Sequence, residues 1–285
     1  LYDFLREMEF NKLLSRAISV YGETGNKKIK SVKPKIKLDT INVKSYESIT
    51  DEKVLDKWIK ILSEQSVIAV DTETSSLNPL DADLVGISFS YAPNKACYIP
   101  LAHKNIKGLK KELVLKKIKP ILVDSSIKKV GQNIKFDFLI LSRSNIEITP
   151  LEDTMLISYT LDAGTNRHNL DTLSEIHLNH KTISYKELVG TGKNKLNFSD
   201  IELDKATEYA AEDADVTLRL YNYLKTRLDE EKLNKIYETF EKPMVKLLSK
   251  LESNGIKVDD IYLKKLSKNF EEKLKKIEKE IYLIA

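Results

Sequence analysis

Apolar residues along this chain follow two different periods, and the change between them divides the chain. The β-branched run Val67–Val70, the alternating stretch 84–91 and the run 96–100 predict three strands, and 128–132 predicts a short fourth. Short turns join the first three, which favours an antiparallel meander. Helical spacing predicts helices over 51–64 and 108–119 and, from Asp153 onward, over 153–162, 169–179, 204–228, 232–253 and 260–283. The pattern predicts an α/β fold in which a mixed sheet is flanked by helices.

The two ends of the chain differ from this central part. Residues 1–21 carry apolar side chains at helical spacing and predict a terminal helix. Residues 22–44 are rich in lysine and have few side chains to bury, which is typical of a solvated linker. We therefore expect one compact domain over 45–236, followed over 237–285 by helices with a narrow apolar stripe. Because the chain begins with Leu1, we expect it to be a piece of a longer protein.

Composition narrows the functional classes only in part. The 285 residues are 41% hydrophobic and 32% charged, as in a globular protein with a sizeable core, and the net charge of +4 does not single out a polyanionic partner. The one cysteine, Cys97, excludes an internal disulfide and a cysteine-based zinc site, suits a reducing cytosol, and is expected to be buried. The four histidines lack metal-ligand spacing. With no signal peptide and no apolar run of about 18 residues, we expect no membrane association.

The first candidate chemistry lies at the end of the first predicted strand. Asp71 and Glu73 directly follow the apolar run, and residues i and i+2 of a strand face the same side. Two carboxylates so close together repel each other in a low dielectric unless a cation lies between them. This stretch predicts a divalent metal site.

Two later motifs add carboxylates to this site. Gln132 and Asn133 follow the fourth strand, and Asp137 comes one helical turn later, where it can point back at the strand end. A favourable interaction with the helix dipole is the alternative for Asp137. In a long helix Tyr209 and Asp213 are four residues apart and share a face, and a structural Tyr–Asp contact is the alternative there. The four acids carry a charge of about −4, which two magnesium or manganese ions would neutralise.

Three motifs together resemble a known family. Val70–Leu77, Gly131–Asp137 and Tyr209–Leu218 are similar to the motifs of the 3′→5′ exonuclease domain of bacterial family A DNA polymerase I, a ribonuclease H-like fold of the four-acid exonucleases with tyrosine in the last motif. The resemblance covers about residues 45–230. Beyond it, 241–259 resembles the start of the polymerase domain and 1–21 the end of a 5′-nuclease region. The chain ends before any polymerase carboxylates, so we expect no polymerisation.

The resemblance implies a role for each motif residue. Asp71, Glu73 and Asp213 would surround one ion, Asp71 and Asp137 would hold a second, and Tyr209 would aim the attacking water. The expected reaction releases nucleoside 5′-monophosphates from a single-stranded or frayed DNA 3′ end. The resemblance also implies a polymerase domain in the same full-length protein, a bacterial cytoplasmic location close to the nucleoid, and a monomeric fragment.

Substrate contacts are implied less directly by the same resemblance. Leu77 would wedge between bases, Tyr185 would stack on one, and Arg167 would contact a phosphate, although an ordinary surface loop is the alternative for the last two. The other candidates are Thr74, Gln132, Asn133 and Phe136, the last standing where the family often has tyrosine. Two alternative functions stay open: a catalytically silent scaffold that binds single-stranded DNA, and an RNA 3′-processing exonuclease of the same fold.

Overall fold

The computed structural model describes residues 2–8, 10–21, 40–192 and 195–284. It divides into two compact units, residues 1–249 and 250–285. Most of the predicted linker 22–44 therefore lies outside the described residues, and only its last five residues can be compared with the structure. The functional motifs all belong to the first unit.

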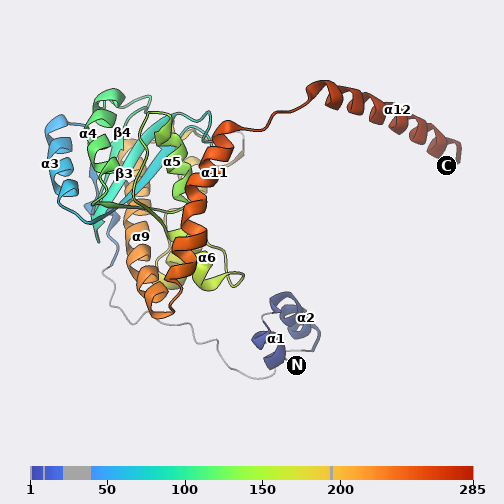
Figure 1. Ribbon diagram of the computed structural model, residues 1–285, viewed down its shortest axis with the longest axis horizontal. Coiled ribbons are helices and arrows are strands. Elements are labelled where there is room, and N and C mark those ends of the chain that lie inside the picture. The colour runs from blue at the N-terminus through green and yellow to red at the C-terminus, as the bar shows by residue number, and fades with distance from the viewer. Residues whose placement is uncertain (1, 9, 22–39, 193–194, 285) are drawn as a thin grey trace. The chain divides into compact units, whose positions relative to one another are not determined.

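One mixed sheet forms the centre of the first unit (Figure 1). In the described part of the chain it has six strands in the order β1-β4-β3-β2-β5-β6. Strands β2, β3 and β4 form the antiparallel meander that the sequence predicts, whereas β5 and β6 continue the sheet in parallel and β1 pairs in parallel with β4. The strands are β1 (Glu47–Ser48), β2 (Val67–Thr74), β3 (Leu84–Ala92), β4 (Lys95–Pro100), β5 (Lys128–Gly131) and β6 (Leu151–Asp153).

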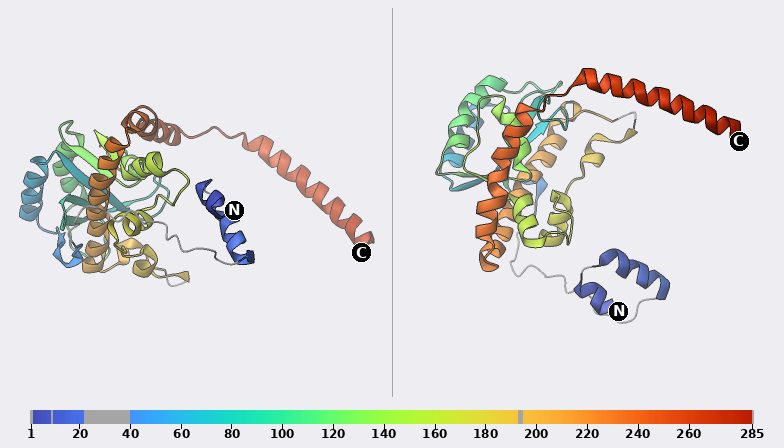
Figure 2. Two further views of the ribbon diagram at one scale, coloured as in Figure 1. Left: turned by 90° about the horizontal axis from the view of Figure 1, so that it is seen from below. Right: turned by 45° about the vertical axis from the view of Figure 1, so that its right-hand side comes forward.

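The two faces of the sheet are covered by different helices (Figure 2). Ile68 and Val70 of β2 pack in one apolar cluster with residues of α3 (Glu52–Ser63), α4 (Lys111–Val123) and α5 (Ile134–Ser142). Ala69 faces the other side and packs against Ala214 and Leu218 of the long helix α9 (Leu203–Glu230). Alternation along β2 therefore decides which side chains meet α9.

Shorter helices complete this unit. They are η1 (Val43–Ser45), α6 (Thr154–Asp162), α7 (Leu170–Leu173), η2 (Ser174–Leu178), α8 (Tyr185–Val189), η4 (Phe198–Asp200), α10 (Asn234–Ile236), η5 (Tyr237–Glu241) and α11 (Lys242–Asn254), of which residues 250–254 belong to the second unit. The helical segments predicted from Asp153 onward are confirmed, with η2 and η5 forming wide π turns inside two of them. The expected boundary at 236 falls inside the compact unit, because Tyr237 is fully buried and Val245 is nearly so.

The prediction of one helix over residues 1–21 is wrong. The structure has α1 (Tyr2–Glu7) and α2 (Asn11–Tyr21), which fold back on each other. The Phe10 amide bonds to the Leu5 carbonyl at 2.9 Å, and the rings of Phe4 and Phe10 meet edge to face at 6.5 Å. This return buries Leu5, which a single straight helix would leave exposed.

The second unit contains α12 (Asp260–Ile284), a helix without buried side chains. None of the helices described has both the length and the apolar composition needed to cross a bilayer.

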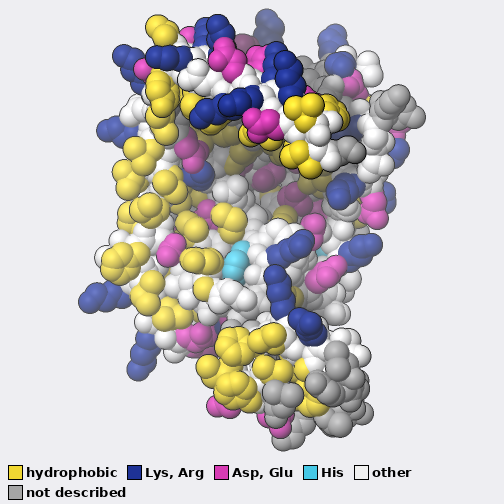
Figure 3. Space-filling model, turned by 90° about the vertical axis from the view of Figure 1, so that its right-hand side faces the viewer, with side chains coloured by type: hydrophobic (Ala, Val, Ile, Leu, Met, Phe, Trp, Pro, Cys, Tyr) yellow, Lys and Arg dark blue, Asp and Glu magenta, His cyan; other side chains and the backbone are white. Residues whose placement is uncertain are grey.

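On the face drawn in Figure 3, lysine and arginine side chains lie among acidic and apolar ones. Basic and acidic side chains are thus mixed on this face. Attraction for an anion would have to come from a local group of basic side chains.

Candidate active site

The end of β2 presents two carboxylates toward α9. Asp71 and Glu73 continue the row begun by Ala69, whose side chain packs on α9. Strand β2 pairs with β5 only as far as Ala69, opposite Val130. Asp71 and Glu73 therefore lie beyond the paired part of β5, where the edge of the sheet leaves room for a ligand.

Helix α9 contributes the third carboxylate. Asp71, Glu73 and Asp213 each offer an oxygen, and these oxygens lie within 4.8 Å of one another. The Tyr209 hydroxyl lies one helical turn from Asp213, whose charge helps to raise the pKa of that hydroxyl. Fully buried alanines at 210, 211 and 214 let α9 approach the sheet closely enough for this convergence. Two motifs separated by more than 130 residues thus meet at one point.

Asp137 reaches the same region from the opposite face of the sheet. Thr72 lies between the two β2 acids and faces away from them, and its hydroxyl donates a 2.6 Å hydrogen bond to Asp137 Oδ1. Repulsion by the Asp71 charge contributes to raising the pKa of Asp137, so the two carboxyls are neighbours. Asp137 is outside the group of three that share the 4.8 Å distance. The four acids therefore form a triad plus one adjacent carboxyl.

The turn before α5 fixes the position of Asp137. Asn133 adopts a left-handed conformation with φ 61°. The buried Asp153 carboxylate accepts hydrogen bonds from the amides of Asn133 and Ile134, both at 3.0 Å. A Cβ atom at Gly131 would lie 2.8 Å from the Ile134 side chain, so the close turn requires glycine. Asp153 also caps α6, and it therefore holds two helix starts in register.

Burial and mutual repulsion shift the protonation of these acids. Burial is the largest cause in each case: it raises the pKa of Asp71 to about 6 and the pKa values of Glu73, Asp137 and Asp213 well above their ordinary values. Neighbouring acids add to the increase for the last three. None of the four forms an ion pair with a described basic residue.

The donor set fits hard divalent cations. Converging carboxylate oxygens without a basic partner are the ligands that magnesium and manganese prefer. A bound cation would also offset the repulsion that now raises their pKa values. Asp71, Glu73 and Asp213 can hold one ion, and the adjacent Asp71 and Asp137 carboxyls offer ligands for another.

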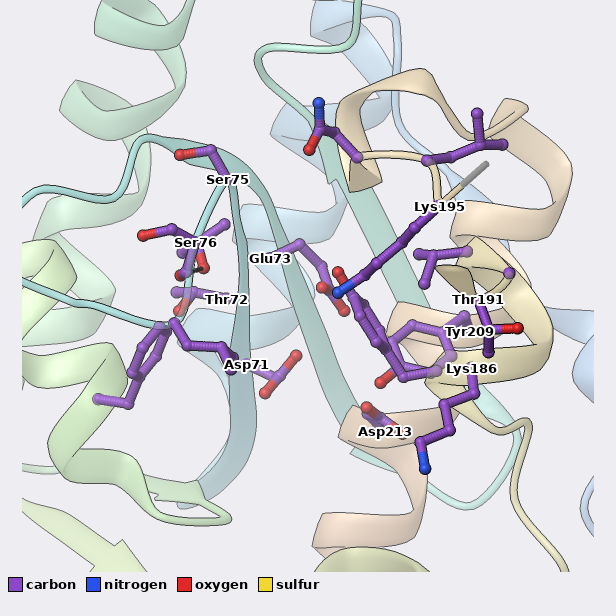
Figure 4. Close-up of a pocket in the computed structure, with 18 of the residues that line it drawn as sticks. Asp71, Thr72, Glu73, Ser75, Ser76, Lys186, Thr191, Lys195, Tyr209 and Asp213 are labelled. Atoms are coloured by element: carbon purple, nitrogen blue, oxygen red, sulfur yellow. Dashed lines mark hydrogen bonds between the residues drawn. The ribbon is translucent and has the colours of Figure 1, made fainter. Parts of the chain in front are cut away.

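A cavity of about 720 Å³ opens in front of the triad (Figure 4). The exit of β2 forms one side, and lining residues from 185–192 and 195–197, together with Tyr209, form the other. Leu77 is 93% exposed at this cavity, and Tyr185 is 38% exposed. The Tyr185 and Tyr209 rings are 5.9 Å apart, so an aromatic surface adjoins the carboxylates.

The structure brings together some of the expected substrate residues. Thr74, Leu77, Phe136 and Tyr185 line the cavity. Its lining does not include the other three candidates, Gln132, Asn133 and Arg167.

The three residues outside the lining are engaged elsewhere or exposed. The Gln132 amide donates to the His168 carbonyl at 2.7 Å and accepts from the Thr154 hydroxyl at 2.6 Å. Asn133 is part of the turn before α5, and Arg167 is exposed in the loop after α6. Direct contacts from these three to a substrate stay predictions.

Sequence reasoning missed four residues that shape the site. Alternation along β2 places Thr72 on the face opposite to Asp71 and Glu73. The sequence does not show that Asp137, from a distant segment, lies on that face. Nothing in the sequence marks Asp153 as a double cap. Lys186 and Lys195, which also line the cavity, are two of many lysines and carry no local signal.

Comparison with known proteins gives the family. Residues 46–229 match the 3′-5′ exonuclease family of family A DNA polymerases. The chain belongs to this family. DNA polymerase I of Rhizobium leguminosarum is 42% identical over 261 residues, covering 85% of this chain and 26% of that protein. The chain thus spans about a quarter of the length of the curated relative, and the expected family resemblance is confirmed.

Solved structures support the same fold. The polymerase domain of Pol1 from M. smegmatis, in complex with a DNA primer-template and dNTP, aligns with a TM-score of 0.65 at 18% identity, over 80% of this chain and 36% of that one. Escherichia coli RNase D, an exoribonuclease involved in structured RNA processing, aligns with a TM-score of 0.56 at 17% identity, over 74% of this chain and 51% of that one. The predicted ribonuclease H-like fold is confirmed.

Proposed function

We infer that this chain is a metal-dependent 3′-5′ exonuclease that removes nucleoside 5′-monophosphates from single-stranded or frayed DNA 3′ ends, as the proofreading part of a DNA polymerase. The observation that carries the proposal is the convergence of Asp71, Glu73 and Asp213 within 4.8 Å at the wall of an open cavity. Family membership supports the direction of digestion. The relatives named DNA polymerase I support DNA as substrate.

The carboxylates have distinct tasks in this reaction. Asp71, Glu73 and Asp213 would hold one divalent cation, and Asp71 with Asp137 a second. When bound, such a pair lowers the pKa of the attacking water and stabilises the leaving 3′ oxygen. Thr72 keeps Asp137 in place through its 2.6 Å hydrogen bond, so the two ligand groups stay at a fixed separation.

Tyr209 orients water without giving up its proton. Burial and the nearby Asp213 charge raise the pKa of its hydroxyl far above the ordinary value, so the phenol stays protonated at neutral pH. A protonated phenol can donate one hydrogen bond and accept another. Tyr209 would therefore orient the attacking water toward the phosphate while keeping its own proton.

The cavity wall suits a separated strand end. Leu77 exposes an apolar side chain that can insert between bases, and Tyr185 offers a ring for stacking. Frayed or mismatched ends cost less free energy to separate than paired ends, so such a pocket selects them without reading sequence. Phe136 and Thr74 complete the wall near the carboxylates.

Substitution of Asp71 tests the proposal. We expect Asp71→Ala to abolish magnesium-dependent shortening of a 5′-labelled single-stranded DNA oligonucleotide, because the remaining acids cannot assemble the cation site. Asp204→Asn, an exposed acid at the start of α9, is the matched control and should retain activity. Wild-type rates in Asp71→Ala would contradict the proposal.

The same assay separates the two alternative functions. A silent scaffold would bind the oligonucleotide without shortening it in magnesium or in manganese. An RNA-processing enzyme would degrade a matched RNA oligonucleotide faster than the DNA. The proposal expects mononucleotide products and a clear preference for DNA.

A further inference from the structure

Two lysines in the cavity wall have no assigned role. Lys186 follows Tyr185 in α8, and Lys195 lies in the segment before η4; both line the cavity and both are exposed. In Figure 4 they lie across the pocket from Ser75 and Ser76 at the exit of β2. Neither forms an ion pair with a residue that the structure describes, in contrast to Lys117 on α4, which contacts two acids.

These lysines form no described ion pair with the acids proposed to bind metal. They share a cavity with Glu73 and Asp213, but no described ion pair within 4.0 Å joins either lysine to either acid. A direct pair would compete with a divalent cation for the same oxygens. The cavity therefore combines an acidic end, suited to cations, with two separate ammonium groups suited to an anion.

One of the two ammonium groups lies next to the ring that can stack on a base. Lys195 Nζ is 5.6 Å from the centroid of the Tyr185 ring, a cation–π distance, and Lys186 is the neighbour of Tyr185 in the same helix. Single-stranded nucleic acid sites pair aromatic platforms with positive charges that follow the backbone. The Tyr185 ring with Lys195 beside it, and Lys186 in the lining of the same cavity, is such a combination.

Repulsion by the carboxylates and attraction by the lysines together indicate how a nucleic acid strand would lie in the cavity. A nucleic acid approaching four carboxylates is repelled by them unless cations intervene, and repulsion falls with distance from the acids. The lysines supply attraction for phosphates that lie outside the cation site. With the 3′ terminal nucleotide at the acidic end, the backbone 5′ of the scissile phosphate would leave along the cavity, and the lysines lie in one of its two walls.

We propose that Lys186 and Lys195 bind the backbone phosphates on the 5′ side of the scissile phosphate, holding the strand while Tyr185 stacks on a base. The ligand class is single-stranded nucleic acid, recognised by its phosphates and without sequence preference. This inference rests on the proposed exonuclease function for the polarity of the strand. The binding that it describes does not need catalysis.

Salt-dependent binding tests the lysines. Fluorescence anisotropy of a labelled oligothymidylate would be measured in EDTA, where no cleavage occurs, for the wild type and for Lys186→Gln/Lys195→Gln. We expect roughly tenfold weaker binding at low salt and a slope of log K against log salt smaller by about 1.4, or about 0.7 for each lost phosphate contact. Lys116→Gln/Lys119→Gln, two exposed lysines on α4, removes the same charge and should leave the slope unchanged.

Steady-state kinetics in magnesium provide a second readout. Loss of uniform substrate binding should raise KM and leave kcat nearly unchanged. Lys186→Arg/Lys195→Arg should restore most of the binding, because the charge is kept. A double glutamine variant with wild-type KM and salt slope, or one no different from the α4 control, would overturn the inference.

Failure of the inference can be told apart from failure of the proposed function. A wild-type chain that digests DNA with lysine-independent KM and salt slope refutes the lysine site alone. A chain that binds DNA through the lysines but never shortens it refutes the exonuclease activity alone. If binding in EDTA is too weak to detect, the KM and its salt dependence decide the matter, and a chain that neither binds nor digests DNA refutes both.

Discussion

At the scale of single residues, the site depends on side chains that hold the acids as much as on the acids. Thr72 lies between Asp71 and Glu73 in sequence but faces the other side of the sheet, where it meets Asp137. One strand therefore supplies two carboxylates to one side and a hydrogen-bond donor for a third carboxyl to the other. Residues that orient metal ligands commonly change metal affinity when replaced.

Replacing Thr72 tests this division of roles. We expect Thr72→Val to weaken manganese binding and to lower activity by about 10- to 100-fold, because Asp137 loses the donor that orients it. Thr72→Ser keeps the hydroxyl and should stay close to the wild type. Manganese titration followed by calorimetry, with thermal unfolding as the check on folding, distinguishes the two. Equal affinities for the valine and serine variants would show that the hydrogen bond is dispensable.

At the scale of elements, β5 joins the site to the opposite helix layer. Gly131 ends the strand and opens the turn to α5, while the fully buried Lys129 points its ammonium at the C-terminal end of α4. Lys129 Nζ donates to the Asp124 carbonyl at 2.6 Å and to the Ile121 carbonyl at 3.3 Å. The dipole of a helix stabilises a positive charge at its C-terminal end, but burial of the amine disfavours its charged form.

Lys129 makes stability depend on pH in a predictable direction. Burial lowers the pKa of its amine from 10.5 to about 8, so between pH 8 and 10.5 the unfolded chain holds more protons at this residue than the folded chain. Stability contributed by this group therefore rises with pH across that window. Urea unfolding of wild type and Lys129→Met at pH 7, 8, 9 and 10 measures it: the wild type should gain relative to the variant as pH rises. A difference that stays constant or moves the other way would contradict the shift.

Prediction from sequence succeeded for elements whose own pattern decides them. The apolar run before Asp71, the alternation of apolar and polar residues over 84–91 and the helical spacing of apolar residues in α9 can be recognised from the local sequence alone. All three elements formed as expected. Strands β1 and β6 have only two and three residues, so their pairing depends on neighbours that the local pattern does not show. The convergence of Asp71 with Asp213 could be proposed only because the motifs resemble a family, since periodicity places a residue on a face and not beside a distant helix.

At the scale of the whole molecule, the active-site unit extends beyond the expected boundary at 236. The Tyr237 hydroxyl donates to Glu152 at 3.0 Å and accepts from the Asp153 amide at 3.0 Å, and Lys242 donates to the same buried Glu152 at 2.8 Å. Asp153 in turn caps α5, the helix that carries Asp137. The start of the C-terminal segment is thus connected to the catalytic side by an unbroken chain of hydrogen bonds.

Two shortened chains test where the functional unit ends. A chain ending at Gly255 should unfold at nearly the same urea concentration as the full chain and keep its activity, because none of the described side chains of α12 is buried. A chain ending at Ile236 loses both hydrogen-bond partners of Glu152, Tyr237 and Lys242. Removal of the partner of a buried charge costs about 3–5 kcal/mol, and the buried side chains of Tyr237 and Val245 are lost as well. This chain should therefore unfold more easily and, through Asp153 and α5, bind manganese more weakly.

Tyr237→Phe in the full chain removes only the hydroxyl. It should lower stability to urea and manganese affinity in the same direction by a smaller amount. Full stability in the chain ending at Ile236 would show that the hydrogen-bonded connection contributes little to either property.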